Sequence, residues 1–247
     1  MKKITFLIII LVVWCPVLTA GETPGLHTTW DHLLQKYVKN GMVDYRGFAR
    51  DAKVLDNYLA KLEKEDISAY SPEQELAFWI NAYNAFTVKL ILNHYPIKSI
   101  KKISNPWGRR VWKVAGQTLS LDHIEHKILR KELKEPRIHF AVVCASIGCP
   151  DLQDFAFTAD KIEEQLALVA RRFFASSKHF YIKKDGGAVI IYTSKIFSWF
   201  GDDFGKNKEE RIAFMQPYLD KPTADKIKKA KLVKFKYLDY NWNLNGK

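Results

Sequence analysis

The sequence predicts an α+β fold, with helices packed around a modest, partly antiparallel sheet. Three observations predict it: helix start and stop signals recur along the chain, one segment alternates between two apolar faces, and a later segment carries the turn residues of a hairpin. The 247 residues are 47% hydrophobic and 27% charged, which excludes a disordered or collagen-like chain. No repeat or flexible linker interrupts the chain after its N-terminus, so we expect a single globular domain over residues 21–247.

The first twenty residues have the pattern of a signal peptide. Lys2 and Lys3 form a positive start, residues 4–14 are apolar, and the segment closes at Ala20. The apolar stretch is shorter than the roughly 20 residues of a membrane-spanning helix. Cys15 leaves a lipoprotein as the weaker alternative, because the residue before it is a bulky tryptophan. We therefore expect cleavage near residue 20 and a periplasmic or secreted protein.

The charge balance is strongly basic and favours anionic partners. Lysine and arginine number 39 against 27 acidic residues, which gives a formal net charge of +12, and +10 remains without Lys2 and Lys3. Basic residues gather in the segments 98–113 and 226–236. A secreted protein has little occasion to meet nucleic acid, so we predict no nucleic-acid partner and expect association with an anionic envelope surface.

Helix signals are strongest in the first half of the chain. Ser71-Pro72-Glu73-Gln74 is a capping box with proline at the first helical position, and it predicts a helix that ends near residue 93. Ser120 caps a second helix, predicted through residue 133. Residues 137–144 alternate two apolar faces, which predicts a central strand buried on both sides.

The second half of the chain mixes helices and strands. Residues 158–175 predict a helix with one apolar stripe, and residues 180–193, turned at Asp185-Gly186-Gly187, predict a hairpin. Short helices are expected near residues 194–200 and 208–219, and a last strand over 233–238. Strands and helices in this arrangement are typical of an α+β domain.

Polar residues in apolar helical stripes are the first candidates for a site. At 100° per residue, Asn84 falls among Ile80, Val88 and Ile91 on the first long helix, and Asn81 borders the same stripe. A buried amide needs partners, so Asn84 either holds a backbone segment or belongs to a site. We assign Asn81 and Asn84 to substrate binding.

The second helix places a carboxylate in its apolar stripe. Glu125 lies among isoleucine and leucine side chains, His126 lies on the flank, and His123 points away. A buried carboxylate must raise its pKa or find a cation, which is common at functional sites and also in structural ion pairs. We expect Glu125 to be largely buried and to share a hydrogen-bond network with Asn84.

The loop that follows the predicted strand holds two cysteines. Cys144 and Cys149 are separated by four residues that include Ser146 and Gly148. Two alternatives remain open. In an oxidising compartment the pair forms a local disulfide; otherwise one thiol becomes a nucleophile activated by an imidazole.

The thiol alternative has candidate partners on the neighbouring elements. His139 lies on the predicted strand and His126 on the preceding helix. One of them should then lie within about 3 to 4.5 Å of a sulfur, with Glu125 orienting the ring. Ser146 is assigned to substrate binding in the same loop.

At these motifs the sequence resembles the family called domain of unknown function 547. The likeness spans most of the chain and is carried by residues 78–85 (FWINAYNA), 119–126 (LSLDHIEH), 136–150 (PRIHFAVVCASIGCP), 196–200 (IFSWF) and 240–245 (YNWNLN). The resemblance implies that Asn81, Asn84, Glu125, His126, His139, Cys144 and Cys149 belong to one shared site, but it supplies no established activity. The order of its elements is also faintly similar to the papain or transglutaminase core.

Three functions compete on these observations. The first is an envelope enzyme that hydrolyses or transfers acyl groups of a peptide, amide or thioester, with Cys144 or Cys149 as nucleophile, His139 or His126 as base and Glu125 as orienting group. The second is a non-catalytic module that binds anionic envelope components. The third is a metal site formed by Glu125, His126 and His139. The spacing of Asp122, Glu125 and His126 is not that of a recognised zinc-protease motif, so we predict neither a metal nor a cofactor.

Overall fold

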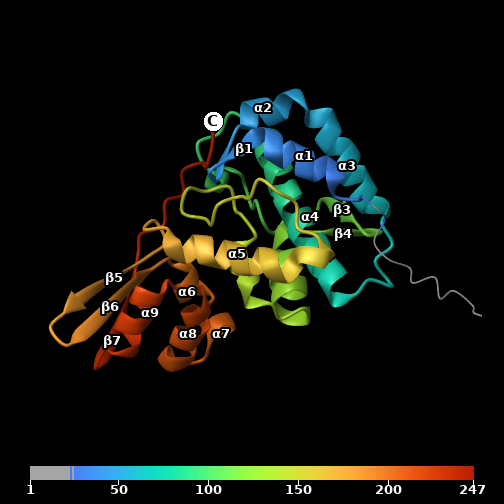
Figure 1. Ribbon diagram of the computed structural model, residues 1–247. Helices are drawn as coiled ribbons and strands as arrows, with labels where there is room; N and C mark the ends of the chain where they lie inside the picture. Colours follow the sequence, from blue (N-terminus) through green and yellow to red (C-terminus); the bar gives the residue numbers. More distant parts are fainter. Residues whose placement is uncertain (1–22, 24) are drawn as a thin grey trace, which may run out of the picture.

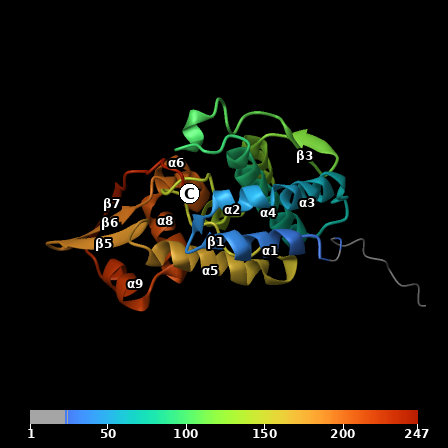
Figure 2. The ribbon, with the colours of Figure 1, turned by 90° about the horizontal axis from the view of Figure 1, so that it is seen from above.

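The computed structural model describes residue 23 and residues 25–247, and the predicted signal peptide lies outside these residues. The fold is α+β, as predicted, with many helices and three small sheets in the described part of the chain (Figure 1). Helices make up the body, and the largest sheet projects from one side of it. Figure 2 shows the same projection from above.

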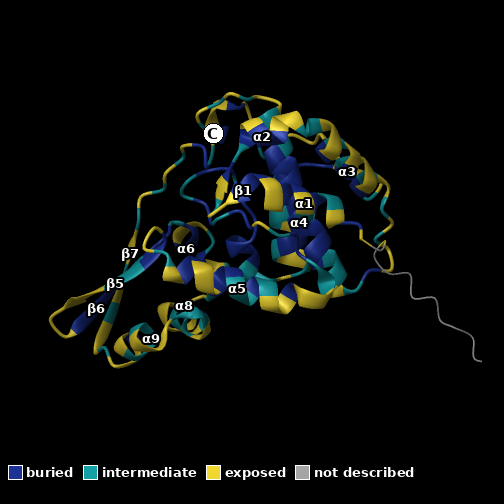
Figure 3. Ribbon diagram, turned by 45° about the horizontal axis from the view of Figure 1, so that its top comes forward, coloured by how far each residue is buried: buried dark blue, intermediate teal, exposed yellow. Residues whose placement is uncertain are grey.

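Helix α4 is the central element of the body. It covers Pro72–Leu92, and the predicted capping box is present: the Ser71 side chain accepts from the Gln74 N–H, and the Gln74 side chain accepts from the Ser71 N–H. Most of its residues are buried on all sides (Figure 3), because α2, α3, α5 and the helix after β4 pack around it. The capping box and the end near residue 93 are confirmed.

The N-terminal elements form a layer over α4. They are α1 (Thr28–Tyr37), β1 (Val38–Lys39), β2 (Met42–Val43), α2 (Tyr45–Arg50) and α3 (Ala52–Lys64). Trp30 stacks on Tyr58 with ring centroids 5.9 Å apart, and both rings are fully buried. The C-terminal tail returns to this layer, where the Val43 N–H donates to the Asn245 carbonyl.

The second predicted helix is present but is wound as a π-helix. After the short turn η1 (Ile100–Lys102) and the hairpin β3 (Trp112–Val114) and β4 (Gln117–Leu119), η2 covers His123–Glu132. Ser120 caps it by accepting from the His123 N–H, as predicted. The Leu133 N–H donates to the Ile128 carbonyl, five residues back, so the 100° step used for the sequence pattern does not hold here.

The predicted strand over residues 137–144 is wrong. Pro136–Phe140 forms a short 3₁₀ helix (η3), and the following residues form no strand. Residues 138–143 are all buried, and a continuous apolar run cannot by itself distinguish a buried strand from another buried segment. Side chains of α4 satisfy the backbone groups that a neighbouring strand would otherwise pair with.

The C-terminal half follows the sequence pattern closely. It contains η4 (Ala159–Lys161), α5 (Ile162–Ala175), β5 (Phe180–Asp185), β6 (Ala188–Thr193), α6 (Ile196–Trp199), α7 (Gly201–Phe204), α8 (Lys208–Met215), η5 (Gln216–Tyr218), α9 (Lys221–Lys228) and β7 (Leu232–Tyr237). β5 and β6 form the predicted antiparallel hairpin, and β7 pairs with β6 in parallel. The sheet is therefore partly antiparallel. Within the described residues, no helix has both the length and the apolar composition to cross a membrane.

Candidate functional site

A cleft of about 210 Å³ brings together the motifs that the sequence separates. Its walls come from α4, η2, the segment after η3, the region of α6 and the C-terminal tail. The lining residues are Tyr83, Trp107, Asp122, Glu125, His126, His139, Val142, Cys144, Cys149, Pro150, Ile196, Trp199, Phe200, Tyr240 and Trp242. Five of the eight sequence-predicted site residues line it: Glu125, His126, His139, Cys144 and Cys149.

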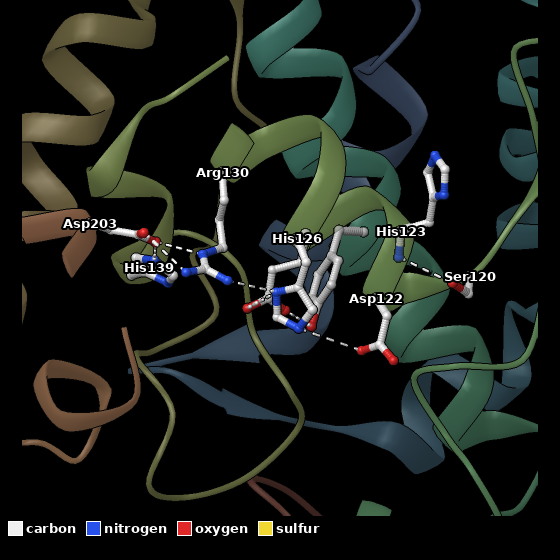
Figure 4. Close-up of polar contacts among 9 residues, drawn as sticks. Ser120, Asp122, His123, His126, Arg130, His139 and Asp203 are labelled. Carbon is white, nitrogen blue, oxygen red and sulfur yellow. Dashed lines mark hydrogen bonds and ion pairs between the residues drawn. The ribbon is translucent and has the colours of Figure 1, made fainter. Parts of the chain in front are cut away.

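One wall is polar and carries a row of charged groups (Figure 4). Arg130 donates two hydrogen bonds to Asp203, from Nε to Oδ2 at 2.5 Å and from Nη2 to Oδ1 at 3.0 Å. His139 Nε2 lies 2.7 Å from the same Oδ2, and the His139 ring stacks on Phe200 at 4.3 Å. His139 is buried, and Asp203 is the carboxylate that holds it in place.

The environment of Asp203 favours its ionised form. Burial opposes ionisation, but the hydrogen bonds and positive charges of His139 and Arg130 outweigh that effect and hold the pKa of Asp203 below its usual range. The same hydrogen bond raises the pKa of Arg130. Neither residue was a candidate from helical patterning, because the four residues of α7 are too few to show a helical pattern and a charged residue such as Arg130 is ordinarily assigned to the surface.

The row continues from Arg130 to His126 and Glu125. His126 Nδ1 lies 3.3 Å from Arg130 Nη1 and 3.9 Å from Glu125 Oε1, and His126 Nε2 lies 3.7 Å from Asp122 Oδ1. The Tyr83 hydroxyl donates to Glu125 Oε2 at 2.8 Å. Burial, together with Glu125, raises the pKa of Tyr83 well above its usual value, so this hydroxyl stays protonated. His123 points away from the row, as predicted (Figure 4).

Both cysteines line the cleft, and their sulfurs are bonded to each other. Cys144 and Cys149 form a disulfide, which is one of the two alternatives from the sequence. The expected pairing of a thiol with an imidazole is not seen: across the described residues, no hydrogen bond links either sulfur to a histidine. The Tyr240 hydroxyl instead lies 3.0 Å from Cys149 Sγ and 3.2 Å from Cys144 Sγ, and the Cys144 N–H donates to Cys149 Sγ at 2.9 Å.

Backbone geometry explains how a loop this short closes. Ala145 has φ 57°, in the left-handed region, which turns the chain back directly after Cys144. The C-terminal tail then pairs with the loop, since the Gly148 N–H donates to the Asn241 carbonyl at 2.8 Å. A side chain at Gly148 would meet the Asn241 nitrogen at 2.8 Å and the Tyr240 ring at 2.9 Å. Glycine at this position lets Tyr240 reach the sulfurs.

Asn81 and Asn84 lie outside the lining of the cleft and hold backbone segments instead. Asn84 donates to the Ala141 carbonyl and accepts from the Val143 N–H, both at 2.9 Å. Asn81 makes the same two-sided contact with Phe157 at 2.8 and 3.0 Å. Both are buried, as expected for Asn84.

The predicted network between Asn84 and Glu125 is wrong. The amide nitrogen and the amide oxygen of Asn84 both bond backbone groups, and Glu125 accepts from Tyr83 instead. Glu125 is nonetheless largely buried, with 13% of its side chain exposed. The π-helix changes the phase of this residue without removing it from the cleft.

Ser146 is buried next to the disulfide but is not among the lining residues. Its Oγ lies 3.4 Å from both Cys144 Sγ and the Cys144 carbonyl oxygen. Among residues 25–247, Glu125, His126 and His139 form no cluster that could hold a metal ion.

Helical patterning missed the aromatic side of the cleft. Tyr240 and Trp242 come from the tail and Trp199 from α6, and their rings contact one another at centroid distances of 4.6 to 5.9 Å. Their only signal was the cluster of aromatic residues in the two distal motifs of the resemblance. Aromatic residues are ordinarily assigned to the core, so composition alone could not single them out.

The family comparison covers the polar wall and the disulfide. A family model described as "Protein of unknown function, DUF547" matches residues 67–174. These residues form a DUF547 domain. It contains Glu125, His126, His139 and both cysteines, whereas Asp203, Trp199 and Tyr240 lie beyond the matched residues. Searches found no similar protein among the curated proteins and no similar chain among the solved structures.

Proposed function

We propose that the protein is a thiol–disulfide oxidoreductase whose Cys144–Cys149 disulfide exchanges with the thiols of a substrate bound in the cleft. The observation that carries this proposal is the pair of donors at Cys149 Sγ: the Tyr240 hydroxyl and the Cys144 N–H. Two hydrogen-bond donors at one sulfur stabilise that sulfur as a thiolate. A stabilised thiolate is a better leaving group when the disulfide is attacked.

The two sulfurs differ in access, which sets the direction of attack. Cys144 is half-buried and Cys149 is 3% exposed. An entering thiolate attacks Cys144 Sγ, the bond between the two cysteines breaks, and its electron pair goes to Cys149. A second thiolate of the substrate then attacks the substrate sulfur of the mixed disulfide and releases Cys144. The substrate loses two electrons and the two cysteines gain them, after which both take up protons.

The remaining cleft residues have consistent roles in this scheme. Burial, and then Glu125, raise the pKa of Tyr240, so its hydroxyl stays protonated and can donate to the departing thiolate. An entering thiol must lose a proton before it attacks. The imidazole of His126 and the carboxylate of Glu125 lie 3.9 Å apart on the cleft wall and supply acceptors for it.

Hydrolysis or acyl transfer receives less support from this geometry. Such a reaction needs a free thiolate activated by a base, whereas the two sulfurs are bonded to each other. Exchange uses the disulfide directly. A disulfide is also typical of oxidising compartments, which supports a periplasmic or secreted location within this proposal.

Binding of anionic envelope components is a second proposed function, favoured by a different observation. The chain has a net charge of +12, and lysines outnumber acidic residues in the strands of the β5–β6–β7 sheet, so this sheet is positively charged. This function needs no chemistry in the cleft and is compatible with exchange.

The test of the exchange proposal is the rate at which dithiothreitol reduces the folded, oxidised protein, followed by the release of free thiol. Tyr240→Phe removes one donor to the leaving thiolate and should slow reduction about tenfold or more. Tyr237→Phe is the matched control, because Tyr237 is 41% exposed on β7 and lines no part of the cleft. Its rate should equal that of the wild type.

Two further results complete this test. Replacing Cys144 or Cys149 with serine should abolish the reaction, and in the reduced wild type one thiol should titrate below the ordinary value of about 8.5. If native protein resists millimolar dithiothreitol, or if Tyr240→Phe reacts at the wild-type rate, the disulfide is only structural and the proposal is wrong.

A further inference from the structure

The open face of the β5–β6–β7 sheet carries lysines and tyrosines in a regular array. In the strand register, Tyr181 lies beside Tyr192 and Tyr192 beside Lys236, while Lys183 lies beside Ile190 and Ile190 beside Lys234. Neighbours in register project to the same side of a sheet. We call the surface formed by Tyr181, Lys183, Tyr192, Lys234 and Lys236 the lysine–tyrosine face.

The two sides of this sheet expose different kinds of side chain. On the opposite side, Val189 and Ile191 are buried in the core. On the side of the lysine–tyrosine face the three lysines are exposed, the two tyrosines are half-buried, and the β6 residues Ala188 and Ile190 are buried. The sheet projects from the body in both ribbon views, and its projecting end is largely exposed in Figure 3. This face is therefore accessible to a large partner.

On this face, lysine ammonium groups lie close to the rings of two stacked tyrosines. The Tyr181 and Tyr192 rings stack with centroids 4.7 Å apart. Lys183 Nζ lies 5.8 and 5.5 Å from these two centroids, and Lys236 Nζ lies 5.7 Å from that of Tyr192. The exposed side chain of Leu232 continues the same face along β7. Asp185, at the hairpin end, is the acidic residue on this side.

We propose that the lysine–tyrosine face docks the protein onto an anionic lipid bilayer. Lys183 and Lys234 lie two strands apart, about 10 Å, and Lys234 and Lys236 lie about 7 Å apart along one strand. The ammonium groups therefore spread over a plane, which complements a planar negative surface better than a single extended polymer. Tyrosine and an exposed leucine among lysines are the residues that settle at a membrane interface.

This docking rests on the second proposed function, binding of anionic envelope components, and names its partner; it is independent of the disulfide chemistry. The face lies on β5, β6 and β7, and none of its residues lines the cleft. Docking would hold the cleft near components of the membrane surface without using any cleft residue. A failure of either proposal therefore leaves the other unaffected.

The experiment measures co-sedimentation of the full chain with phosphatidylcholine vesicles that contain 30% phosphatidylglycerol or none. Each lysine close to an anionic membrane strengthens binding about fivefold. The triple variant Lys183→Glu, Lys234→Glu and Lys236→Glu should therefore weaken binding to the anionic vesicles by at least about 100-fold. Wild-type binding should also fall as salt is raised.

A charge-matched control separates this face from overall basicity. Lys39→Glu, Lys53→Glu and Lys61→Glu change the net charge equally at exposed positions on β1 and α3. This control should bind within about threefold of the wild type by the same electrostatic argument. All variants share residues 1–22, so any contribution of that segment is equal in each.

Folding and the nature of the partner are checked in the same series. A triple lysine-to-glutamine variant, with the circular dichroism melt of each protein, guards against misfolding and should bind between the wild type and the glutamate variant. The proposal is overturned if both face variants bind like the wild type or if the control loses as much. It is also overturned if the wild type binds soluble polyphosphate but not the anionic vesicles, because the partner would then be a polymer.

Discussion

The two walls of the cleft are built in different ways. The polar wall, formed by Tyr83, Glu125, His126 and His139, stands on α4, η2 and η3 near the centre of the body. The aromatic wall, formed by Trp199, Tyr240 and Trp242, comes from the end of α6 and from the tail. Trp199 is 46% exposed, whereas His139 is almost fully buried. The fold thus holds His139 of the polar wall in the interior and leaves Trp199 of the aromatic wall at the surface.

The difference between the two walls reflects two separate needs: a fixed geometry for charged groups and contact area for a ligand. Charged groups need a fixed geometry, because their interaction energies change steeply with distance and burial. Aromatic rings can contribute contact area while partly exposed. Changes in the polar wall should therefore lower stability, and changes in the aromatic wall should alter ligand contacts while stability stays almost constant.

The largest effect is expected for the support of the polar wall. Asn84→Ala leaves the Ala141 carbonyl and the Val143 N–H buried without partners, which should lower the free energy of unfolding by about 2 to 4 kcal/mol. Urea denaturation measures the change. Asn93→Ala is the control, because Asn93 caps the same helix but is exposed, and it should stay within about 0.5 kcal/mol of the wild type. Equal losses in the two variants would show that the two hydrogen bonds of Asn84 do not stabilise the fold.

A smaller and pH-dependent effect is expected at Asp203. Asp203→Asn leaves the partly buried Arg130 without its carboxylate and should cost about 1 to 3 kcal/mol at pH 7, reduced from a fully buried pair because both side chains are 22% exposed. The pKa of Asp203 is lowered in the folded state. Its contribution is therefore present above the unfolded value, about 3.9, and is lost as pH falls through the lower folded value.

The measurement for Asp203 is the unfolding free energy between pH 7 and pH 2. The wild type should lose stability below about pH 4 more steeply than Asp203→Asn. Asp202→Asn is the neighbouring control, since its carboxylate is 89% exposed and its contact with Arg211 is 3.3 Å. Parallel pH curves for the wild type and Asp203→Asn would show that Asp203 does not stabilise the fold in its ionised form.

The smallest effect on stability is expected at the aromatic wall. Trp199→Ala should change the unfolding free energy by less than about 1 kcal/mol, because nearly half of its surface is exposed. If the cleft binds a peptide dithiol, the KM for a peptide with aromatic flanks should rise threefold or more, while reduction by dithiothreitol stays constant. Val54→Ala, at an exposed apolar position on α3, should change neither quantity.

Much of the fold could be predicted because its signals are local. The capping box of α4, the Ser120 cap and the Asp185-Gly186-Gly187 turn each depend on residues next to one another, and each is present. The segment 137–144 could not be predicted in the same way. Its apolar run fits a strand equally well, and what decides its shape is the pair of hydrogen bonds from Asn84, 57 and 59 residues away.

For the candidate site, too, the sequence indicated some features and the tertiary structure decided others. The sequence by itself indicated which polar residues needed buried partners, because Asn84 and Glu125 stand among apolar residues, where an unpaired group is costly. It also placed two cysteines within bonding reach. Only the tertiary structure decided their partners: Asp203 for His139, Tyr83 for Glu125, and Tyr240 for the sulfurs. Those contacts join residues 42 to 96 positions apart, and helical periodicity or turn chemistry carries no information over such separations.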